Sequence, residues 1–161
     1  FWLDINYGNY PYITSSNTLP YSACSLGFPP CLINNIYGAV KIYDTRVGYD
    51  PDFPETLLDD PDLQKLGEIG EEYGSTTGRK RIVNWLNLDK LIKAINISGT
   101  THLVISKIDI IEQLDVYKYY YENKLITVNS FDQLHEEICL IILTSCVFCK
   151  HIYFSNNPYS I

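Results

Sequence analysis

The sequence predicts an α/β layered fold, in which strands and helices alternate along a single domain. Two segments carry helix signals: Asn87 precedes an apolar stripe over residues 88–97, and Ser130 with Gln133 precedes a stripe that reaches about residue 146. Short β-type segments separate these helices, and residues 116–128 predict a hairpin that adds some antiparallel pairing. With 161 residues, 46% of them hydrophobic, the chain is long enough to bury one core.

The elements are expected in the following order. Residues 2–6 predict a strand, residues 7–22 a polar, turn-rich loop, and Ile36–Arg46 a second strand. Prolines and the acidic run 59–62 mark an exposed connection before a short helix over residues 61–69. After a basic loop at 73–81 we expect a helix at 88–97, a strand at 102–106, hairpin strands at 116–121 and 125–128, the long helix to about 146, and a strand at 151–154.

Charge and composition narrow the class of protein. The net charge of -7 argues against nucleic acid or an anionic membrane as the main partner. The sequence contains neither a membrane-length apolar run nor a basic segment followed by an apolar signal segment. Five irregularly spaced cysteines suit reduced thiols. We therefore expect a cytoplasmic protein.

The C-x-x-C pair at Cys146 and Cys149 is a candidate for redox chemistry or metal binding. His151 is close in sequence, but no second cysteine pair completes a zinc site. Three candidate ligands at a helix end are more often a chance grouping, so we expect no metal site here. His102 and His135 are expected to be structural or exposed.

The segment Tyr73–Arg81 places three cations beside a flexible, hydroxyl-rich turn in an otherwise acidic protein. Glycines at 74 and 78 permit a close backbone approach to a ligand, and the guanidinium groups of Arg79 and Arg81 can grip carboxylates or phosphates with paired hydrogen bonds. A solvated basic turn is the alternative. The pattern favours an anion-binding loop.

A second candidate follows the apolar run 103–105, where Ser106-Lys107-Ile108-Asp109 predicts a strand that runs into a base-reading loop. The Asp109 carboxylate could accept hydrogen bonds from the ring N–H and exocyclic amine of guanine, whereas adenine presents a ring acceptor there. The stem of Lys107 could lie along the base. A surface charge pair is the alternative interpretation.

Five segments together carry a family resemblance: residues 3–17, Tyr43–Gly48, Phe53–Glu55, the basic loop and Ser106–Asp109. In this order and spacing, from residue 1 to about 118, the chain closely resembles the C-terminal half of adenylosuccinate synthetase. The resemblance implies a layered, P-loop-NTPase-like sheet. Residues 1–161 would be the C-terminal part of one synthetase domain. The chain has no G-x-x-x-x-G-K-[ST] run and no methionine, so we expect the phosphate loop and general base to come from upstream sequence or another polypeptide.

The resemblance also implies an activity. Family members use GTP and Mg2+ to phosphorylate O6 of IMP, after which the amine of L-aspartate displaces phosphate and gives adenylosuccinate, the committed step from IMP to AMP. The Mg2+ ligands and catalytic residues are expected in the N-terminal half, which implies that this part alone is inactive. The complete protein is expected to be a homodimer.

The same resemblance assigns roles residue by residue. IMP would be contacted by Thr14, Val47 and Arg79; aspartate by Ser75, Thr76, Thr77, Gly78, Arg79, Lys80 and Arg81; and GTP by Arg81, Lys107, Ile108, Asp109, Ser155, Asn156 and Asn157. Lys80 replaces an arginine usual in the family, and Asn157 replaces a glycine. Lysine at position 80 keeps the positive charge but lacks the planar guanidinium group of arginine. Asparagine at position 157 tolerates the left-handed backbone of a glycine turn better than most residues do.

Two alternatives to this function stay open. One is the related phage enzyme that joins aspartate to dGMP, which Asp109 mildly disfavours because it indicates a guanine triphosphate donor. The other is a non-catalytic nucleotide-binding remnant of a split synthetase. Between Lys118 and His151 the chain is shorter than typical members, which implies a compact variant.

Overall fold

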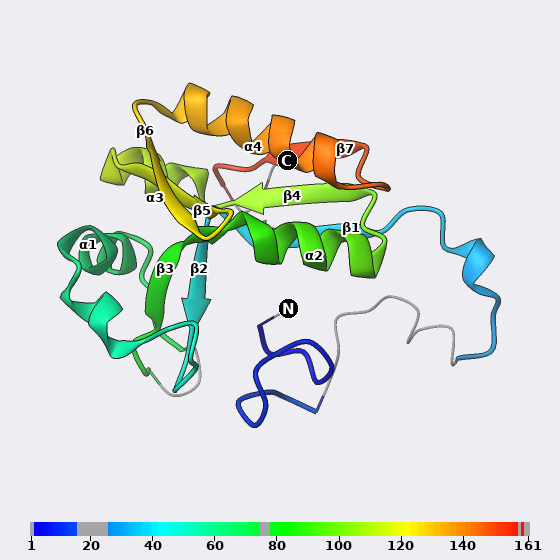
Figure 1. Ribbon diagram of the computed structural model, residues 1–161, viewed down its shortest axis with the longest axis horizontal. Coiled ribbons are helices and arrows are strands. Elements are labelled where there is room, and N and C mark those ends of the chain that lie inside the picture. The colour runs from blue at the N-terminus through cyan, green and yellow to red at the C-terminus, as the bar shows by residue number, and fades with distance from the viewer. Residues whose placement is uncertain (1, 16–25, 75–77, 158, 160–161) are drawn as a thin grey trace.

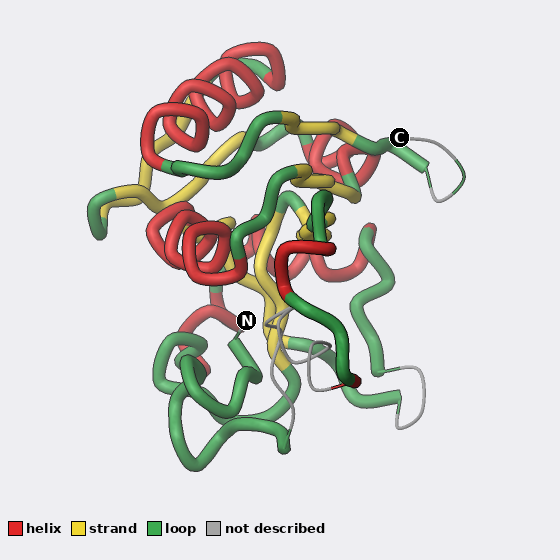
Figure 2. Tube along the Cα trace, turned by 90° about the vertical axis from the view of Figure 1, so that its right-hand side faces the viewer, coloured by secondary structure: helices red, strands yellow, loops and turns green. Residues whose placement is uncertain are grey.

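The computed structural model describes residues 2–15, 26–74, 78–157 and 159, and it has the predicted α/β architecture (Figure 1). A parallel three-stranded sheet has the order β1-β4-β7. Its strands are β1 (Tyr37–Lys41), β4 (His102–Ser106) and β7 (His151–Phe154). Helices α2 (Leu88–Ser98) and α4 (Phe131–Ser145) lie on one side of these strands, which are seen nearly end-on in Figure 2.

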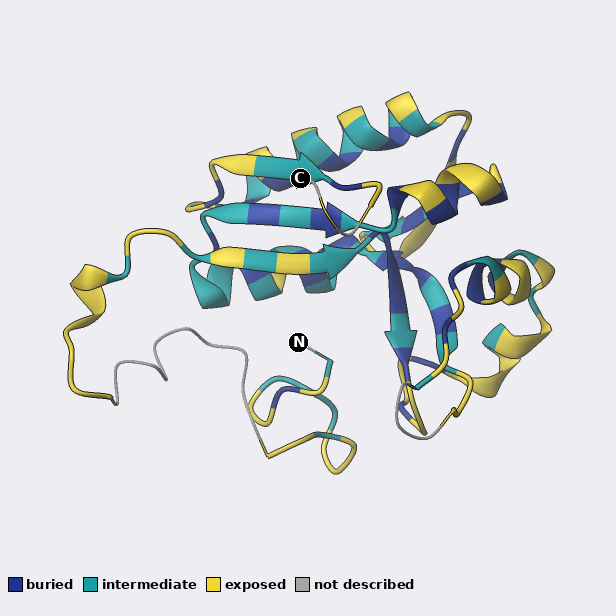
Figure 3. Ribbon diagram, turned by 180° about the vertical axis from the view of Figure 1, so that it is seen from behind, coloured by how far each residue is buried: buried dark blue, intermediate teal, exposed yellow. Residues whose placement is uncertain are grey.

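The opposite face of this sheet has no helix on it among the described residues (Figure 3). Tyr37 and Ala39 of β1 are exposed, and their partners in register on β4, His102 and Val104, are half-buried. Leu103 and Ile105 alternate with these residues along β4 and are buried. Parallel sheets are normally covered on both faces. This sheet is therefore covered on one face only by the part of the chain that the structure describes.

A mixed four-stranded sheet has the order β2-β3-β5-β6 and turns away from the first. Strand β3 pairs antiparallel with β2 and parallel with β5, and β5 and β6 form the hairpin. The bounds are β2 (Tyr43–Arg46), β3 (Ile82–Asn87), β5 (Tyr117–Tyr121) and β6 (Lys124–Val128), with α1 (Pro61–Ile69), α3 (Ile108–Leu114) and the 3-10 helices η2 (Pro30–Leu32) and η3 (Glu55–Asp59).

Local signals located several elements correctly. Helix α1 has the predicted bounds, and α2 begins after Asn87, whose side chain accepts a hydrogen bond from the backbone N of Lys90 at 2.9 Å. Helix α4 begins after Ser130, whose hydroxyl accepts from the backbone N of Gln133 at 3.2 Å. The predictions of strand 102–106, the hairpin and strand 151–154 are confirmed, with β5 and β6 each beginning one residue from the expected start.

The predicted strand at 2–6 is wrong, because these residues form turns. The Asp4 carboxylate accepts hydrogen bonds from the backbone N of Asn6 at 2.8 Å and of Tyr7 at 3.2 Å, and its carbonyl accepts from Gly8 N at 2.8 Å. A side chain that satisfies nearby backbone donors competes with strand pairing. Of the predicted loop 7–22, residues 16–22 lie outside the described residues.

The predicted single strand Ile36–Arg46 is two strands that belong to different sheets. The chain changes sheet at Ile42, whose backbone N donates to the Ser106 carbonyl at 2.9 Å and whose side chain is buried. Lys41 and Tyr43 therefore end one sheet and begin the other.

Among the described residues, one strand and one α-helix were not predicted from the sequence, in addition to the 3-10 helices η2 and η3. Strand β3 follows the basic loop directly and buries Val83, Trp85 and Leu86. Helix α3 begins at Ile108, where we expected a base-reading loop, because Lys107 takes a left-handed conformation with φ 68° and four apolar residues of the next seven enter the core. The connection after β4 is thus a single residue.

Candidate functional site

The carboxyl ends of β1, β4 and β7 meet at one edge of the parallel sheet, the edge at which α/β proteins usually bind ligands. Lys107 and Asp109 follow β4, and Ser155 and Asn157 follow β7. Together with Ser106 they line a cavity of about 290 Å³. The structure thus brings together residues predicted for GTP that are far apart in the sequence.

Backbone hydrogen bonds fix these two segments against each other. The backbone N of Ile108 donates to the Ser155 carbonyl at 3.3 Å, and the backbone N of Ser155 donates to the Ile105 carbonyl at 2.8 Å. The Ser155 hydroxyl donates to the Asn157 carbonyl at 2.7 Å. Asp109 is exposed in the first turn of α3, so its carboxylate is accessible at this cavity.

The basic loop is closed at its base by main-chain bonds. Tyr73 bridges to Lys80, Gly74 N donates to the Arg79 carbonyl at 2.8 Å, and Arg81 N donates to the Glu72 carbonyl at 2.9 Å. Gly78 has φ 64°, a left-handed conformation that favours glycine. Arg79 and Lys80 are exposed. Ser75, Thr76 and Thr77 lie outside the described residues.

A buried carboxylate, which sequence reasoning missed, lies between this loop and the sheet edge. Glu72 is 2% exposed, and its two oxygens accept hydrogen bonds from Lys41 Nζ at 2.6 and 2.8 Å, Tyr43 Oη at 2.7 Å and Arg81 Nη1 at 2.8 Å. We call these four residues the Glu72 cluster. Lys107 Nζ lies nearby and donates to the Gly70 carbonyl at 3.4 Å.

The charge states in the Glu72 cluster follow from burial and hydrogen bonding. Burial by itself would raise the pKa of Glu72, but the hydrogen bonds from Lys41, Tyr43 and Arg81 outweigh it and hold that pKa below its ordinary value. Burial is the main cause that lowers the pKa of Lys41, the nearby cations Arg81 and Lys107 lower it further, and Glu72 only partly offsets these effects. The ionised Glu72 therefore stabilises the fold above the ordinary carboxyl pKa of 4.5, and that contribution is lost as the pH falls through the lower folded-state pKa.

The structure relates Val47 and Thr14 through Arg46. Arg46 and Ile82 form the last pair of the antiparallel register of β2 and β3, so Val47 leaves β2 at the end where Arg81 enters β3. Arg46 also donates to the Tyr12 carbonyl, and its Nε lies 3.1 Å from Oδ2 of the buried Asp50. The Thr14 hydroxyl donates to the Leu3 carbonyl at 3.1 Å. Val47 thus lies beside the base of the basic loop, and Thr14 belongs to the segment that Arg46 contacts.

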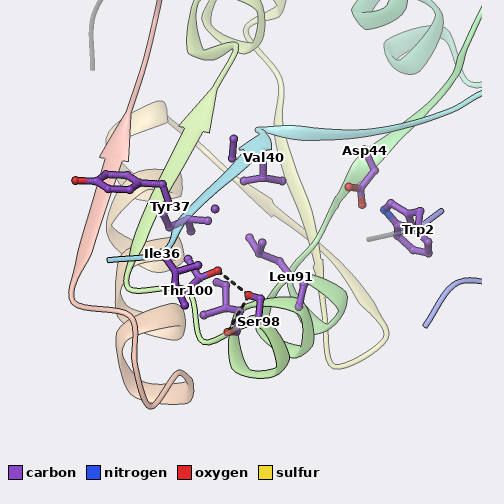
Figure 4. Close-up of a pocket in the computed structure, with 13 residues that line it drawn as sticks. Trp2, Ile36, Tyr37, Val40, Asp44, Leu91, Ser98 and Thr100 are labelled. Carbon is purple, nitrogen blue, oxygen red and sulfur yellow. Dashed lines mark hydrogen bonds between the residues drawn. The ribbon is translucent and has the colours of Figure 1, made fainter. Parts of the chain in front are cut away.

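A larger cavity of about 380 Å³ lies between β1 and α2 (Figure 4), but no residue predicted for a ligand lines it. Its one charged residue is Asp44, which accepts a hydrogen bond from Asn87 N at 3.0 Å and lies close to Trp2. Ser98 and Thr100 share a hydrogen bond of 2.7 Å at its other end. The smaller cavity at the sheet edge is instead lined by serine, lysine, aspartate and asparagine residues, most of them predicted to bind a ligand, so it is the candidate site.

Burial raises the pKa of Asp44 to about 6, against hydrogen bonds from Asn87 and Trp2 that lower it. Between the ordinary value of 3.8 and about 6, the folded protein holds a proton that the unfolded chain has released. Stability therefore falls as the pH rises through this window, and the full penalty is present above it.

Between pH 4 and pH 8 we expect Asp44→Asn to gain about 2 to 3 kcal/mol in free energy of unfolding relative to the wild type, because the amide carries no buried charge and keeps an acceptor for Asn87. The amide also turns a donor toward Trp2, but that loss is the same at every pH. Below pH 4 the gain should be small. Urea unfolding at pH 4 to 8 measures it, with Asp59→Asn at an exposed position as the control. A gain that does not vary with pH would contradict the assignment.

The C-x-x-C pair at Cys146 and Cys149 offers little chemistry in this structure. Burial raises the pKa of Cys146 to about 11 and also raises that of Cys149, so both thiols are protonated and weakly nucleophilic at neutral pH. Among the described residues, no three or more His, Cys, Asp or Glu side chains are grouped to hold a metal ion. No helix within the described ranges is both long and apolar enough to cross a membrane.

Comparison with known proteins gives one consistent result. The sequence profile of the family described as adenylosuccinate synthetase matches residues 1–139. Adenylosuccinate synthetase of Komagataella phaffii is 48% identical over 130 residues, which cover 78% of this chain and 30% of the relative. The enzyme of Chlorobaculum parvum is 41% identical over 144 residues, which cover 86% of this chain and 32% of the relative.

A solved structure agrees with the sequence relatives. The chain resembles fully ligated adenylosuccinate synthetase from Plasmodium falciparum with a TM-score of 0.73 and 26% identity, over 97% of this chain and 46% of that one. The chain spans only 30% and 32% of the length of the two curated relatives above.

Proposed function

This chain belongs to the adenylosuccinate synthetase family, and from that premise we propose that it supplies the aspartate-binding and guanine-binding parts of a ligase that joins IMP to L-aspartate with GTP. In the proposed reaction, GTP phosphorylates O6 of IMP and the aspartate amine then displaces phosphate. Because the chain spans about a third of its curated relatives, the complete activity is assigned to the full-length polypeptide that carries it.

The observation that carries the proposal is the cavity at the carboxyl edge of the parallel sheet. Lys107, Asp109, Ser155 and Asn157 line it, and the Glu72 cluster connects it to the basic loop. An exposed carboxylate beside a lysine stem is suited to the two donors of a guanine edge. The loop offers cations for a dicarboxylate and for spread phosphoryl charge.

Each residue has a distinct role in the proposal. Asp109 accepts from the guanine ring N–H and exocyclic amine, the stem of Lys107 flanks the base, and Ser155, Asn156 and Asn157 border it. Ile108 borders the base through its backbone, because its side chain is buried in the core. Arg79 grips an aspartate carboxylate and reaches the IMP ribose, and Arg81 serves the GTP side. Val47 and Thr14 contact the ribose and phosphate of IMP. The remaining proposed aspartate-binding residues are Ser75, Thr76, Thr77, Gly78 and Lys80.

The described residues do not form a site for the Mg2+ that the family implies, since no suitable group of carboxylates and histidines occurs among them. No residue of this chain is therefore assigned a role in binding the metal. In the proposal its ligands, the phosphate loop and the general base belong to the part of the relatives that lies outside this chain. A homodimeric, cytoplasmic enzyme is part of the same proposal.

The test is adenylosuccinate formation by the natural full-length polypeptide with IMP, aspartate, Mg2+ and GTP, run beside reactions with dGMP or ATP. Product only with IMP and GTP supports the proposal. Product from dGMP would instead assign the phage-type reaction. Absence of product with either acceptor, from a folded full-length protein, would overturn a catalytic function and favour a non-catalytic remnant.

A further inference from the structure

Glu72 contacts the basic loop through both its backbone and its side chain, and its side chain also contacts the junction of the two sheets. Its carbonyl accepts from Arg81 N at 2.9 Å, and its carboxylate accepts from Arg81 Nη1 at 2.8 Å. Both ends of Arg81 are thus held by the same residue. The remaining acceptor capacity of the carboxylate is directed to Lys41 and Tyr43, which lie on either side of the change of sheet at Ile42.

The charge balance of the Glu72 cluster is positive. One carboxylate faces two cations, and nearby Lys107 and Asp109 carry opposite charges that offset each other. Glu72 is 2% exposed, whereas the side chains of Lys41 and Arg81 are 27% and 30% exposed. The anion is therefore buried, and the cations are partly open to solvent. Such an arrangement fixes the positions of cations without cancelling their attraction for an external anion.

We propose that Glu72 is a positioning residue, which holds the Arg81 guanidinium between the basic loop and the carboxyl edge of the parallel sheet so that it can bind the polyphosphate of GTP. This inference rests on the proposed function, because it takes GTP as the ligand at that edge. Glu72 acts through Arg81 and does not touch the nucleotide.

Two conservative substitutions of Glu72, by glutamine and by aspartate, make the inference testable. A glutamine has nearly the same shape, but its amide offers one oxygen acceptor and turns an N–H₂ group toward one of three donors. Lys41 contacts both carboxylate oxygens and keeps one of them, so the N–H₂ group faces Arg81 or Tyr43, and in either orientation Arg81 loses its ion pair with a charged carboxylate. Glu72→Asp keeps the negative charge on a shorter side chain and should retain part of the GTP affinity.

The first experiment measures GTP affinity by calorimetric titration in the full-length polypeptide. We expect Glu72→Gln to weaken GTP binding by about tenfold, the size typical of one lost hydrogen bond to a charged group, and Glu72→Asp to weaken it less. In the Arg81→Ala background, Glu72→Gln should have little further effect. Asp62→Asn is the matched control, because it removes an ion pair of 2.7 Å with Lys118 away from this edge.

A second measurement does not depend on nucleotide binding. The guanidinium NMR resonance of Arg81, assigned by its loss in Arg81→Lys, should be slowly exchanging in the wild type and averaged in Glu72→Gln. Equal and additive losses of GTP affinity in both backgrounds would overturn the inference, as would an unchanged Arg81 resonance. Absence of ligation with these responses intact would refute the proposed reaction alone. A wild type that binds no GTP would overturn both.

Discussion

Replacing Arg79 with alanine should lower kcat/KM for aspartate by about 30- to 4,000-fold, which corresponds to roughly 2 to 5 kcal/mol. The reason is that a substrate carboxylate, desolvated in the closed site, would lose its bidentate partner. Arg79 is exposed in this structure, and its carbonyl closes the basic loop through Gly74 N. The substitution therefore leaves the main-chain closure of the loop in place.

Steady-state kinetics at varied aspartate concentration measures the effect of Arg79→Ala. Arg79→Lys should recover only part of the activity, since lysine keeps the charge without the planar fork. Lys124→Ala removes an exposed cation from the hairpin and should leave kcat/KM unchanged. An unaltered dependence on aspartate in Arg79→Ala would refute the assignment of this loop.

Replacing Asp109 with asparagine should reduce the preference for GTP over ITP by about 10- to 100-fold. The carboxylate can accept from both the ring N–H and the exocyclic amine of guanine, whereas an amide offers one oxygen and turns a donor toward the other group. ITP lacks the exocyclic amine, so its use should change less than that of GTP. Initial rates at varied GTP and ITP concentrations measure the ratio.

The control for Asp109→Asn is Asp115→Asn, the same change at the opposite end of α3. Asp115 has φ 58°, a conformation that asparagine also adopts readily, so the helix end should be preserved. If the preference for GTP survives in Asp109→Asn, the cavity at the sheet edge does not read the guanine base.

The sequence predicted those elements whose causes are local. Asn87 and Ser130 each satisfy a backbone donor within their own first helical turn, so capping signals located α2 and α4. By contrast, the break at Ile42 depends on the distant Ser106 carbonyl, and no local pattern marks it. At Asp4 a local signal existed, because aspartate commonly binds nearby backbone donors, but apolar neighbours favoured a strand instead.

The candidate site follows the same division. Residue types identified Lys107 and Asp109 as ligand candidates, but their meeting with Ser155 depends on β4 and β7 being neighbours in the sheet. Glu72 was missed because an acidic residue beside a glycine-rich loop is ordinarily expected to be exposed on the surface. A signal was present in Lys41, a cation inside an apolar strand, since a buried charge requires a partner.

The change of sheet at Ile42 has a mechanical consequence. A one-residue joint between two sheets would ordinarily act as a hinge, but Lys41 and Tyr43 on its two sides donate to the same buried carboxylate oxygen of Glu72. Bending at the joint would pull one donor away and leave it or the acceptor unsatisfied in a buried environment. The two sheets should therefore move as one rigid body, and any opening of the protein to admit its substrates must occur elsewhere.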